Sequence, residues 1–328
     1  QQLDVAEAII AVGTELKQGM VSDQNGRRFS TTDVPTLKAK IGAPVVAIHR
    51  ADLHFALLEA VGDGIVHLDA ECIRVSQDET QVTAHFADGR SASADILVAA
   101  DGIHSAVRQQ LMPKISLRYA GYPAWRGVVN TADSRIDASI FFEAWGVGQR
   151  FGLLRLNPTQ VYWFATENAP AGQTRPPAAT KQHLIKQFAH WFAPVPDVLE
   201  ATPAEVILHN DIYDFPPQKG WSVGRVVFLG DAIHPTTPNM GQGACMAIES
   251  ALVLADCLQK HTAYAAAFAA YEQRRQPRTA VITNNSWRIG QVGQWENPLL
   301  CRLRNGIMRL TPEQVLTKQL INTLSYPI

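Results

Sequence analysis

The sequence predicts an α/β protein of two domains. One domain contains a mixed sheet and helices, and the other is an antiparallel sheet that lies between the two segments of the first domain in the sequence. Residues 95–100 and 226–229 are short, nearly continuous apolar runs, which suit strands buried on both faces of a parallel sheet. Between them, residues 119–209 are rich in aromatic side chains at alternating positions, a pattern typical of antiparallel strands.

Helices and strands can be placed in order along the first hundred residues. The order is a helix at 3–10 ending near Gly13, a hairpin at 16–29, a loop at 31–44, an amphipathic helix at 51–61, and strands at 65–68, 71–76 and 81–86. Residues 23–26 (D-Q-N-G) supply the turn of the hairpin.

Helices are expected to dominate the chain after the aromatic region, beginning with one that starts near Ala244. The aromatic region itself is predicted to contain one helix, at 181–192. A further helix places Tyr264, Phe268 and Tyr271 on one face. Pro277 is expected to kink or restart it, because proline cannot donate the helical hydrogen bond.

Composition excludes several classes of protein. The 328 residues are 46% hydrophobic and 18% charged, with a formal net charge of −1, so nothing favours disorder or nucleic-acid binding. The four cysteines form no C-x-x-C pair, which predicts neither zinc nor disulfides and favours a reducing, cytoplasmic setting. We see no signal peptide or transmembrane segment and expect a monomer or homodimer.

The strongest chemical signal is residues 224–243, G-R-V-V-F-L-G-D-A-I-H-P-T-T-P-N-M-G-Q-G. A buried strand is followed by Asp231 and then by Gly241 and Gly243, which open a helix. Ligands of open α/β folds bind at the carboxyl ends of strands, where an aspartate can accept hydrogen bonds from cofactor hydroxyl groups. The N-terminus of the next helix favours negative charge. His234 fits either a place near a cofactor or a structural turn.

This string closely resembles the second flavin-binding motif of the group A flavoprotein monooxygenases, the para-hydroxybenzoate hydroxylase-like family. Residues 94–108, A-D-I-L-V-A-A-D-G-I-H-S-A-V-R, match that family's D-G-x-x-S-x-x-R pattern. Arg50 at a helix start and residues 264–278 also match, so the resemblance covers nearly the whole chain. It is nearest to the branch of FAD-dependent urate hydroxylase and zeaxanthin-epoxidase-like proteins.

The resemblance implies an FAD/NAD(P)-binding Rossmann-like domain formed by residues 1–118 and 218–265. It also implies an antiparallel substrate domain at 119–217 and a helical region at 266–328. The residues that would bind the cofactor are Arg50, Asp101, Gly102, Arg108, Gly230, Asp231, Pro235, Gly241, Gln242 and Gly243. Asp231 would hold hydroxyl groups of FAD, and Asp101 and Arg108 would shape a groove shared with NAD(P)H.

The implied reaction is hydroxylation or epoxidation of an aromatic or conjugated small molecule. NAD(P)H reduces FAD, dioxygen adds at the flavin C4a position, and the hydroperoxide transfers one oxygen atom. The flavin carries this chemistry, so we expect neither a catalytic side chain nor a metal site. Arg150, Tyr162, Trp163 and Phe164 are candidate substrate contacts. Tyr162 and Phe164 share one face of a strand and Trp163 lies on the other, and the sequence does not say which face is core.

One family feature is missing from the printed sequence, which contains no G-x-G-x-x-G turn. Gln1 aligns just after that turn and its βαβ unit. Without such a unit we expect a loss of two strands and of FAD affinity. The missing unit raises one alternative to the monooxygenase, a non-catalytic remnant of the fold that binds an aromatic or lipid ligand without FAD. A flavin reductase or dehydrogenase without oxygen transfer is a third possibility.

Overall fold

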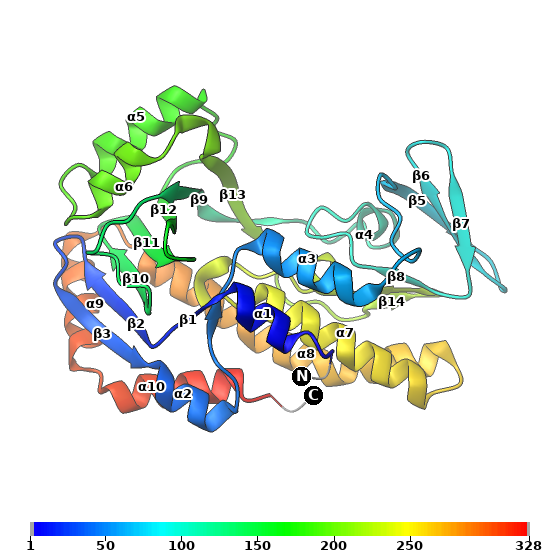
Figure 1. Cartoon of the computed structure of the whole chain (residues 1–328). Helices are drawn as coiled ribbons and strands as arrows, with labels where there is room; N and C mark the ends of the chain where they lie inside the picture. The colour runs from blue at the N-terminus through cyan, green and yellow to red at the C-terminus, as the bar shows by residue number, and fades with distance from the viewer. Residues whose placement is uncertain (1–2, 327–328) are drawn as a thin grey trace. The chain divides into compact units, whose positions relative to one another are not determined.

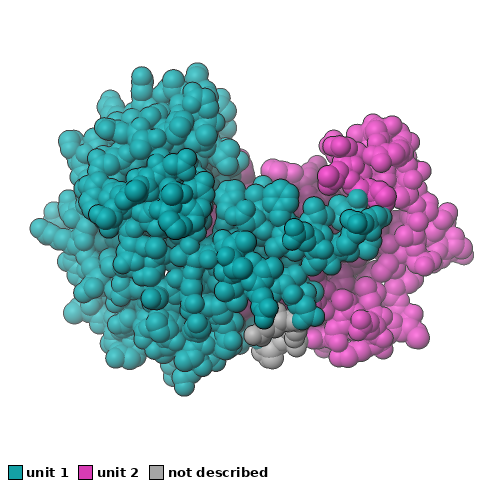
Figure 2. Space-filling view, viewed as in Figure 1, with its two compact units in different colours: residues 1–66, 121–211, 292–327 teal, residues 67–120, 212–291, 328 magenta. Residues whose placement is uncertain are grey.

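A seven-stranded sheet is the centre of one of the two units into which the chain divides. The computed structural model describes residues 3–326, and Figure 1 shows the elements along the chain. Unit 1 consists of residues 1–66, 121–211 and 292–327, and unit 2 of residues 67–120 and 212–291 together with residue 328 (Figure 2).

The large sheet has the strand order β13-β9-β12-β11-β10-β2-β3. Its strands are β2 (Gln18–Asp23), β3 (Arg28–Asp33), β9 (Arg118–Asn130), β10 (Ile140–Trp145), β11 (Gln149–Arg155), β12 (Gln160–Glu167) and β13 (Leu208–Asp214). Strands β9, β12, β11 and β10 pair antiparallel in turn, as the alternating aromatic residues predict. Strand β2 pairs with β10 in parallel, from Gln18 opposite Ile140 to Asp23 opposite Trp145.

This parallel pair joins the beginning of the chain to the antiparallel sheet. Residues 1–66 therefore belong to unit 1, although the sequence grouped them with the cofactor domain. The sequence could not show this, because β2 and β10 lie more than a hundred residues apart. The domain boundaries proposed from sequence remain a prediction.

Strand β12 has one core face and one half-buried face. Val161, Trp163 and Ala165 are fully buried, whereas Tyr162 and Phe164 are half-buried. The buried set packs in one cluster with Leu184 and Phe188 of α5 (Pro177–Phe188) and with Val195, Val198 and Leu199 of α6 (Val195–Ala201). The structure thus identifies the face that the sequence left undecided.

Shorter elements complete unit 1. They are α1 (Ala6–Val12), β1 (Thr14–Glu15), α2 (Val34–Ile41), β4 (Val46–Ala47), α3 (Arg50–Val61), η1 (Ala204–Val206), α9 (Pro298–Leu310) and α10 (Glu313–Leu324). Strands β1 and β4 form a small antiparallel pair. Helix α9 packs against β3, and α10 packs against β3 and α2; Figure 1 shows α9 and α10 near β3.

Unit 2 contains two three-stranded sheets. The first, β5-β6-β7, is an antiparallel meander of Cys72–Gln77, Val82–Phe86 and Ser91–Ala94. The second has the order β14-β15-β8, formed by Ser222–Val223, Val226–Phe228 and Leu97–Ala99. Strands β15 and β8 are parallel. The fold class, α/β with mixed and antiparallel sheets and C-terminal helices, is confirmed.

Two long helices carry the core of unit 2. Helix α7 (Gly243–Lys260) buries Met246, Val253 and Leu254, and α8 (Tyr264–Gly293) buries Phe268 and Tyr271. These side chains, except that of Met246, pack in one cluster with β15. Helix α8 continues through Pro277 without a restart. Burial of Ile282 and Thr283 beyond the proline holds the second half in place.

Three local predictions were wrong or incomplete. Residues 31–44 are not a loop, since β3 extends to Asp33 and α2 follows, with Asp33 capping its N-terminus and Gly42 ending it in a left-handed conformation. Residues 65–68 form no strand. Strand β8 is buried on one face only, because Ala99 is buried and Val98 is exposed.

Candidate functional site

The two apolar runs that predicted buried strands are paired, which brings their acidic residues to one edge of a sheet. Ala99 of β8 lies opposite Phe228 of β15, and the backbone N–H of Leu229 donates to the Ala99 carbonyl at 3.0 Å. Asp101 and Asp231 follow two and three residues after that pair, at the carboxyl ends of the strands. Parallel α/β sheets bind ligands at such an edge.

Asp231 offers an unused acceptor. It lies in the single turn η2 (Gly230–Ala232), which packs against α7. Its side chain is open to solvent, yet surrounding protein atoms are close enough that burial raises the pKa of the carboxyl group. No residue between 3 and 326 donates a hydrogen bond to this carboxylate. A ligand hydroxyl group could supply the missing donor.

Glycines and a helix start leave open space beside this turn. Gly102, with φ +78°, and Gly241, with φ +62°, have no atoms within 4 Å of the place where a side chain would begin. Gln242 and Gly243 begin α7, and no side chain from the described part of the chain caps the first turn. The free N–H groups and the helix dipole there favour a negatively charged group.

Arg108 ties the two acidic loops together. It lies in α4 (Ala106–Leu111), only 2% exposed, and its guanidinium donates to the Ala232 carbonyl at 2.9 Å and to the Ile103 carbonyl at 2.5 Å. Asp101 accepts a hydrogen bond from the Val107 N–H at 3.3 Å. Burial lowers the pKa of Arg108, and the negative charge of Asp101 opposes that shift. Arg108 is therefore a brace beneath the site, not an exposed ligand.

A buried polar network supports the same turn from α7 and α8. His234 is 4% exposed, and its Nε2 lies 3.0 Å from Ser250 Oγ. Arg275 donates to Ser250 Oγ at 3.1 Å and pairs with Glu249 at 2.8 Å. The sequence singled out neither Ser250 nor Arg275. The available signal was polar residues at positions of apolar helices that should face the core.

His234 is consequently structural and neutral. Burial, together with the charge of Arg275, lowers the pKa of His234 to about 4. The unfolded chain takes up a proton near the ordinary value of 6.5, whereas the folded protein does so only near 4. The stability that neutral His234 contributes is therefore complete above the unfolded value and is lost as the pH falls through this window.

As the pH falls from 6.5 to about 4, we expect protonation of His234 to lower the free energy of unfolding by up to about 1.4 kcal/mol per pH unit. Urea unfolding of the wild type and of His234→Gln at several pH values measures the effect. His104→Gln is the matched control, since His104 is an exposed histidine of the same unit. An equal pH slope in the wild type and His234→Gln would contradict the assignment.

Other predicted cofactor residues divide between the units. Pro235 is buried, and its carbonyl accepts from Thr283 at 3.3 Å. Gly230 takes φ +63°, which permits the η2 turn. Arg50 begins α3 in unit 1, is exposed, and follows His49, which does not cap the helix. The structure thus brings together the predicted residues of unit 2, and Arg50 belongs to the other unit.

The candidate substrate residues differ in burial. Trp163 is fully buried, stacks on Phe151 at 5.7 Å and donates from its indole to Thr202 at 2.9 Å, which leaves it no surface for a ligand. Arg150 is 4% exposed and pairs with Glu143 at 2.8 Å. Both side chains are buried in the protein core, and the substrate role predicted for them stays a prediction. Tyr162 and Phe164 remain candidates on the half-buried face of β12.

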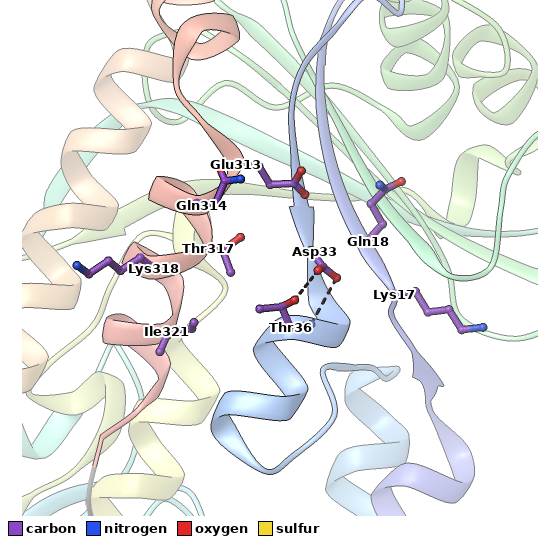
Figure 3. Close-up of a pocket in the computed structure, with 9 residues that line it drawn as sticks. All are labelled: Lys17, Gln18, Asp33, Thr36, Glu313, Gln314, Thr317, Lys318 and Ile321. Atoms are coloured by element: carbon purple, nitrogen blue, oxygen red, sulfur yellow. Dashed lines mark hydrogen bonds between the residues drawn. The ribbon is translucent and has the colours of Figure 1, made fainter.

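A separate cavity of about 560 Å³ lies in unit 1 between α10 and the β2-β3-α2 segment. Figure 3 shows Asp33 and Glu313 facing this space. Lysines, acids, threonines and glutamines make up most of the lining, and none of the predicted site residues takes part. Asp33 is engaged with Thr36 of α2. Ile321 is the one apolar residue among the nine that line it, so this open groove is a poor match to an aromatic ring.

Within residues 3–326, no group of three or more histidine, cysteine, aspartate or glutamate side chains is arranged to hold a metal ion. None of the helices described for this chain combines the length and hydrophobicity needed to cross a bilayer.

Comparisons with known proteins show the family to which the chain belongs. Residues 5–286 match the family model described as an FAD binding domain. The chain is 41% identical to aurachin C monooxygenase/isomerase of Stigmatella aurantiaca, over 94% of this chain and 80% of that protein. It is 35% identical to the zeaxanthin epoxidase of Solanum lycopersicum over 85% of this chain, but spans only 44% of that protein.

A solved structure is similar over nearly the whole chain. HpxO of Klebsiella pneumoniae, complexed with FAD and uric acid, aligns with a TM-score of 0.90 at 28% identity, covering 98% of this chain and 82% of that one. The fold and site thus define a flavin-binding oxidoreductase. The chain belongs to the FAD-dependent monooxygenases of group A, as the sequence motifs predicted.

The described residues of unit 2 fit FAD. An unpartnered carboxylate at Asp231, open space at Gly102 and Gly241, and the uncapped start of α7 provide an acceptor, room and a positive potential. These are what the hydroxyl groups and the electron-rich ring of the cofactor need. The comparisons lend no support to a non-catalytic remnant.

Proposed function

We propose that this monooxygenase uses NAD(P)H and dioxygen to oxygenate an aromatic or conjugated small molecule. The observation that carries the proposal is the pairing of β8 with β15, which brings the Asp101 and Asp231 loops together under the brace of Arg108. Family membership supports the same reaction type.

The residues of unit 2 would bind and orient the cofactor. Asp231 would accept a hydrogen bond from an FAD hydroxyl group, and the N-terminus of α7 would stabilise negative charge on the ring. Bound FAD, reduced by NAD(P)H, supplies the activation of dioxygen and the transfer of one oxygen atom. In the balanced reaction, substrate, NAD(P)H, a proton and dioxygen give oxygenated product, NAD(P)⁺ and water.

An alkyl-substituted quinolone is the first substrate to test. A further relative, 33% identical over 81% of this chain, is the 2-heptyl-3-hydroxy-4(1H)-quinolone synthase of Pseudomonas aeruginosa. Its name describes an aromatic ring with a saturated chain. Tyr162 and Phe164 support such a ligand, because an aromatic, half-buried strand face can pack against a flat ring.

Product analysis with isotopically labelled dioxygen tests the proposal. Purified protein is supplied with FAD, with NADH or NADPH, and with a panel of an alkyl quinolone, uric acid and salicylate. We expect one labelled oxygen atom in one organic product. Peroxide release without a labelled product from any member would contradict oxygen transfer and favour a flavin reductase.

A further inference from the structure

Helix α9 carries an unpartnered apolar stripe on the surface of unit 1. Five large aliphatic side chains are exposed along it, with exposed fractions of 43–84%: Leu299, Leu300, Leu303, Ile307 and Leu310. At 100° per residue these five positions fall within a sector of roughly 100°. Isolated exposed leucines are ordinary, whereas five on one helix face form a continuous patch.

The opposite face of α9 is firmly attached to the protein. Arg304, 4% exposed, donates to the carbonyls of Val292, Gly293 and Gly146 at 3.0–3.2 Å. Cys301 is buried on the same side, and Asn297 caps the N-terminus of the helix. The outward stripe is therefore held in a fixed orientation and is not the frayed end of a loose helix.

Positive charge borders the stripe on one side. Arg302 and Arg309 lie seven residues apart, and thus on one side of the helix, and both are exposed. Arg309 reaches Asp23 only at 3.5 Å, so its guanidinium is weakly engaged there. The thirteen residues of α9 include three arginines and no aspartate or glutamate.

We propose that α9 is an interfacial helix that seats the protein on an anionic lipid bilayer. Amphipathic helices that lie in the membrane interface typically carry leucine or isoleucine on one face and arginine beside it. The aliphatic side chains would enter the region of the acyl chains, and Arg302 and Arg309 would meet the lipid phosphates.

Charge argues against a second copy of the chain as the occupant. Two α9 helices packed antiparallel, stripe to stripe, would place Arg302 and Arg309 of both copies along the same edge of the contact. Neither helix has an acidic residue to compensate them. Anionic headgroups, in contrast, complement the arginines directly. The proposal does not depend on the substrate or on FAD.

Flotation of the full-length protein with lipid vesicles tests the proposal. We expect binding to vesicles of phosphatidylcholine mixed equally with phosphatidylglycerol, little binding to phosphatidylcholine alone, and a decrease with added salt. Leu299→Gln/Leu303→Gln/Ile307→Gln should weaken binding by more than about tenfold. Arg302→Gln and Arg309→Gln should each weaken it by roughly fivefold.

Control variants distinguish a loss of vesicle binding from a loss of the folded structure. Leu68→Gln and Leu208→Gln alter leucines that are 74% and 62% exposed outside α9, and should leave vesicle binding unchanged. Circular dichroism and the thermal midpoint show whether each variant is folded. Absence of vesicle binding by the wild type, equal binding to neutral vesicles, or a dimer that the triple substitution converts to a monomer would each overturn the proposal.

Discussion

Replacement of Asp231 by alanine is expected to weaken FAD binding by about 10- to 100-fold. A hydrogen bond from a cofactor hydroxyl group to a charged acceptor contributes about 1.5–3 kcal/mol, and alanine removes the acceptor. Titration of the purified protein with FAD, followed by quenching of flavin fluorescence, measures the change in the dissociation constant.

Asp95→Ala is the matched control for this substitution. Asp95 is an exposed aspartate of the same unit, just before β8, and its loss should leave FAD affinity unchanged. Equal affinities for the wild type and Asp231→Ala would remove Asp231 from the cofactor site.

The Asp231 side chain is expected to favour FAD binding but to lower the stability of the FAD-free protein. Burial raises the pKa of its carboxyl group, so ionisation of Asp231 costs more free energy in the folded protein than in the unfolded chain. The unfolded state loses its proton at lower pH than the folded state, and folding is penalised as the pH rises through this window. Asp231→Asn should therefore stabilise the FAD-free protein slightly at neutral pH.

Replacement of Arg108 by leucine is expected to lower the free energy of unfolding by about 3–5 kcal/mol. The substitution removes two charge-assisted hydrogen bonds and leaves the buried Ala232 carbonyl and the part-buried Ile103 carbonyl without this donor. It also releases the Asp101 loop from the Asp231 turn, so FAD affinity should fall with stability. Urea unfolding and the FAD titration measure the two effects.

Two further arginine variants serve as controls for Arg108→Leu. Arg90→Leu removes an exposed arginine of the same unit, with a side chain that is 52% exposed, and should change the free energy of unfolding by no more than about 0.5 kcal/mol. Arg108→Lys retains the charge but lacks the fork that reaches two carbonyls, so it should be intermediate. Arg108→Leu with the stability of Arg90→Leu would show that the brace is unimportant.

The parts of the fold predicted from sequence are those specified by local patterns. The apolar runs at β8 and β15 end at Asp-Gly and Gly-Asp, and the structure pairs them. The hairpin of β2 and β3 follows its turn residues, and α7 begins at the predicted glycines. Strand period, turn chemistry and helix starts can each be read from a few neighbouring residues.

Features that depend on distant residues could not be predicted. The parallel pairing of β2 with β10 has no local signal. The core face of β12 is determined by the helices that cover it, so alternation alone did not separate Trp163 from Tyr162. Arg108 was predicted as a groove residue, yet its guanidinium is buried and donates to the carbonyl of Ala232, on a loop that lies 124 residues away in the sequence.

The central claim is that the Asp101 loop, the Asp231 turn and the start of α7 together bind FAD. A crystal structure of the protein grown with FAD tests it most directly. We expect cofactor density beside Asp231, with a hydroxyl group within hydrogen-bonding distance of its carboxylate and the flavin ring near the N-terminus of α7. Density elsewhere on the protein, with the Asp231 carboxylate free of cofactor, would contradict it.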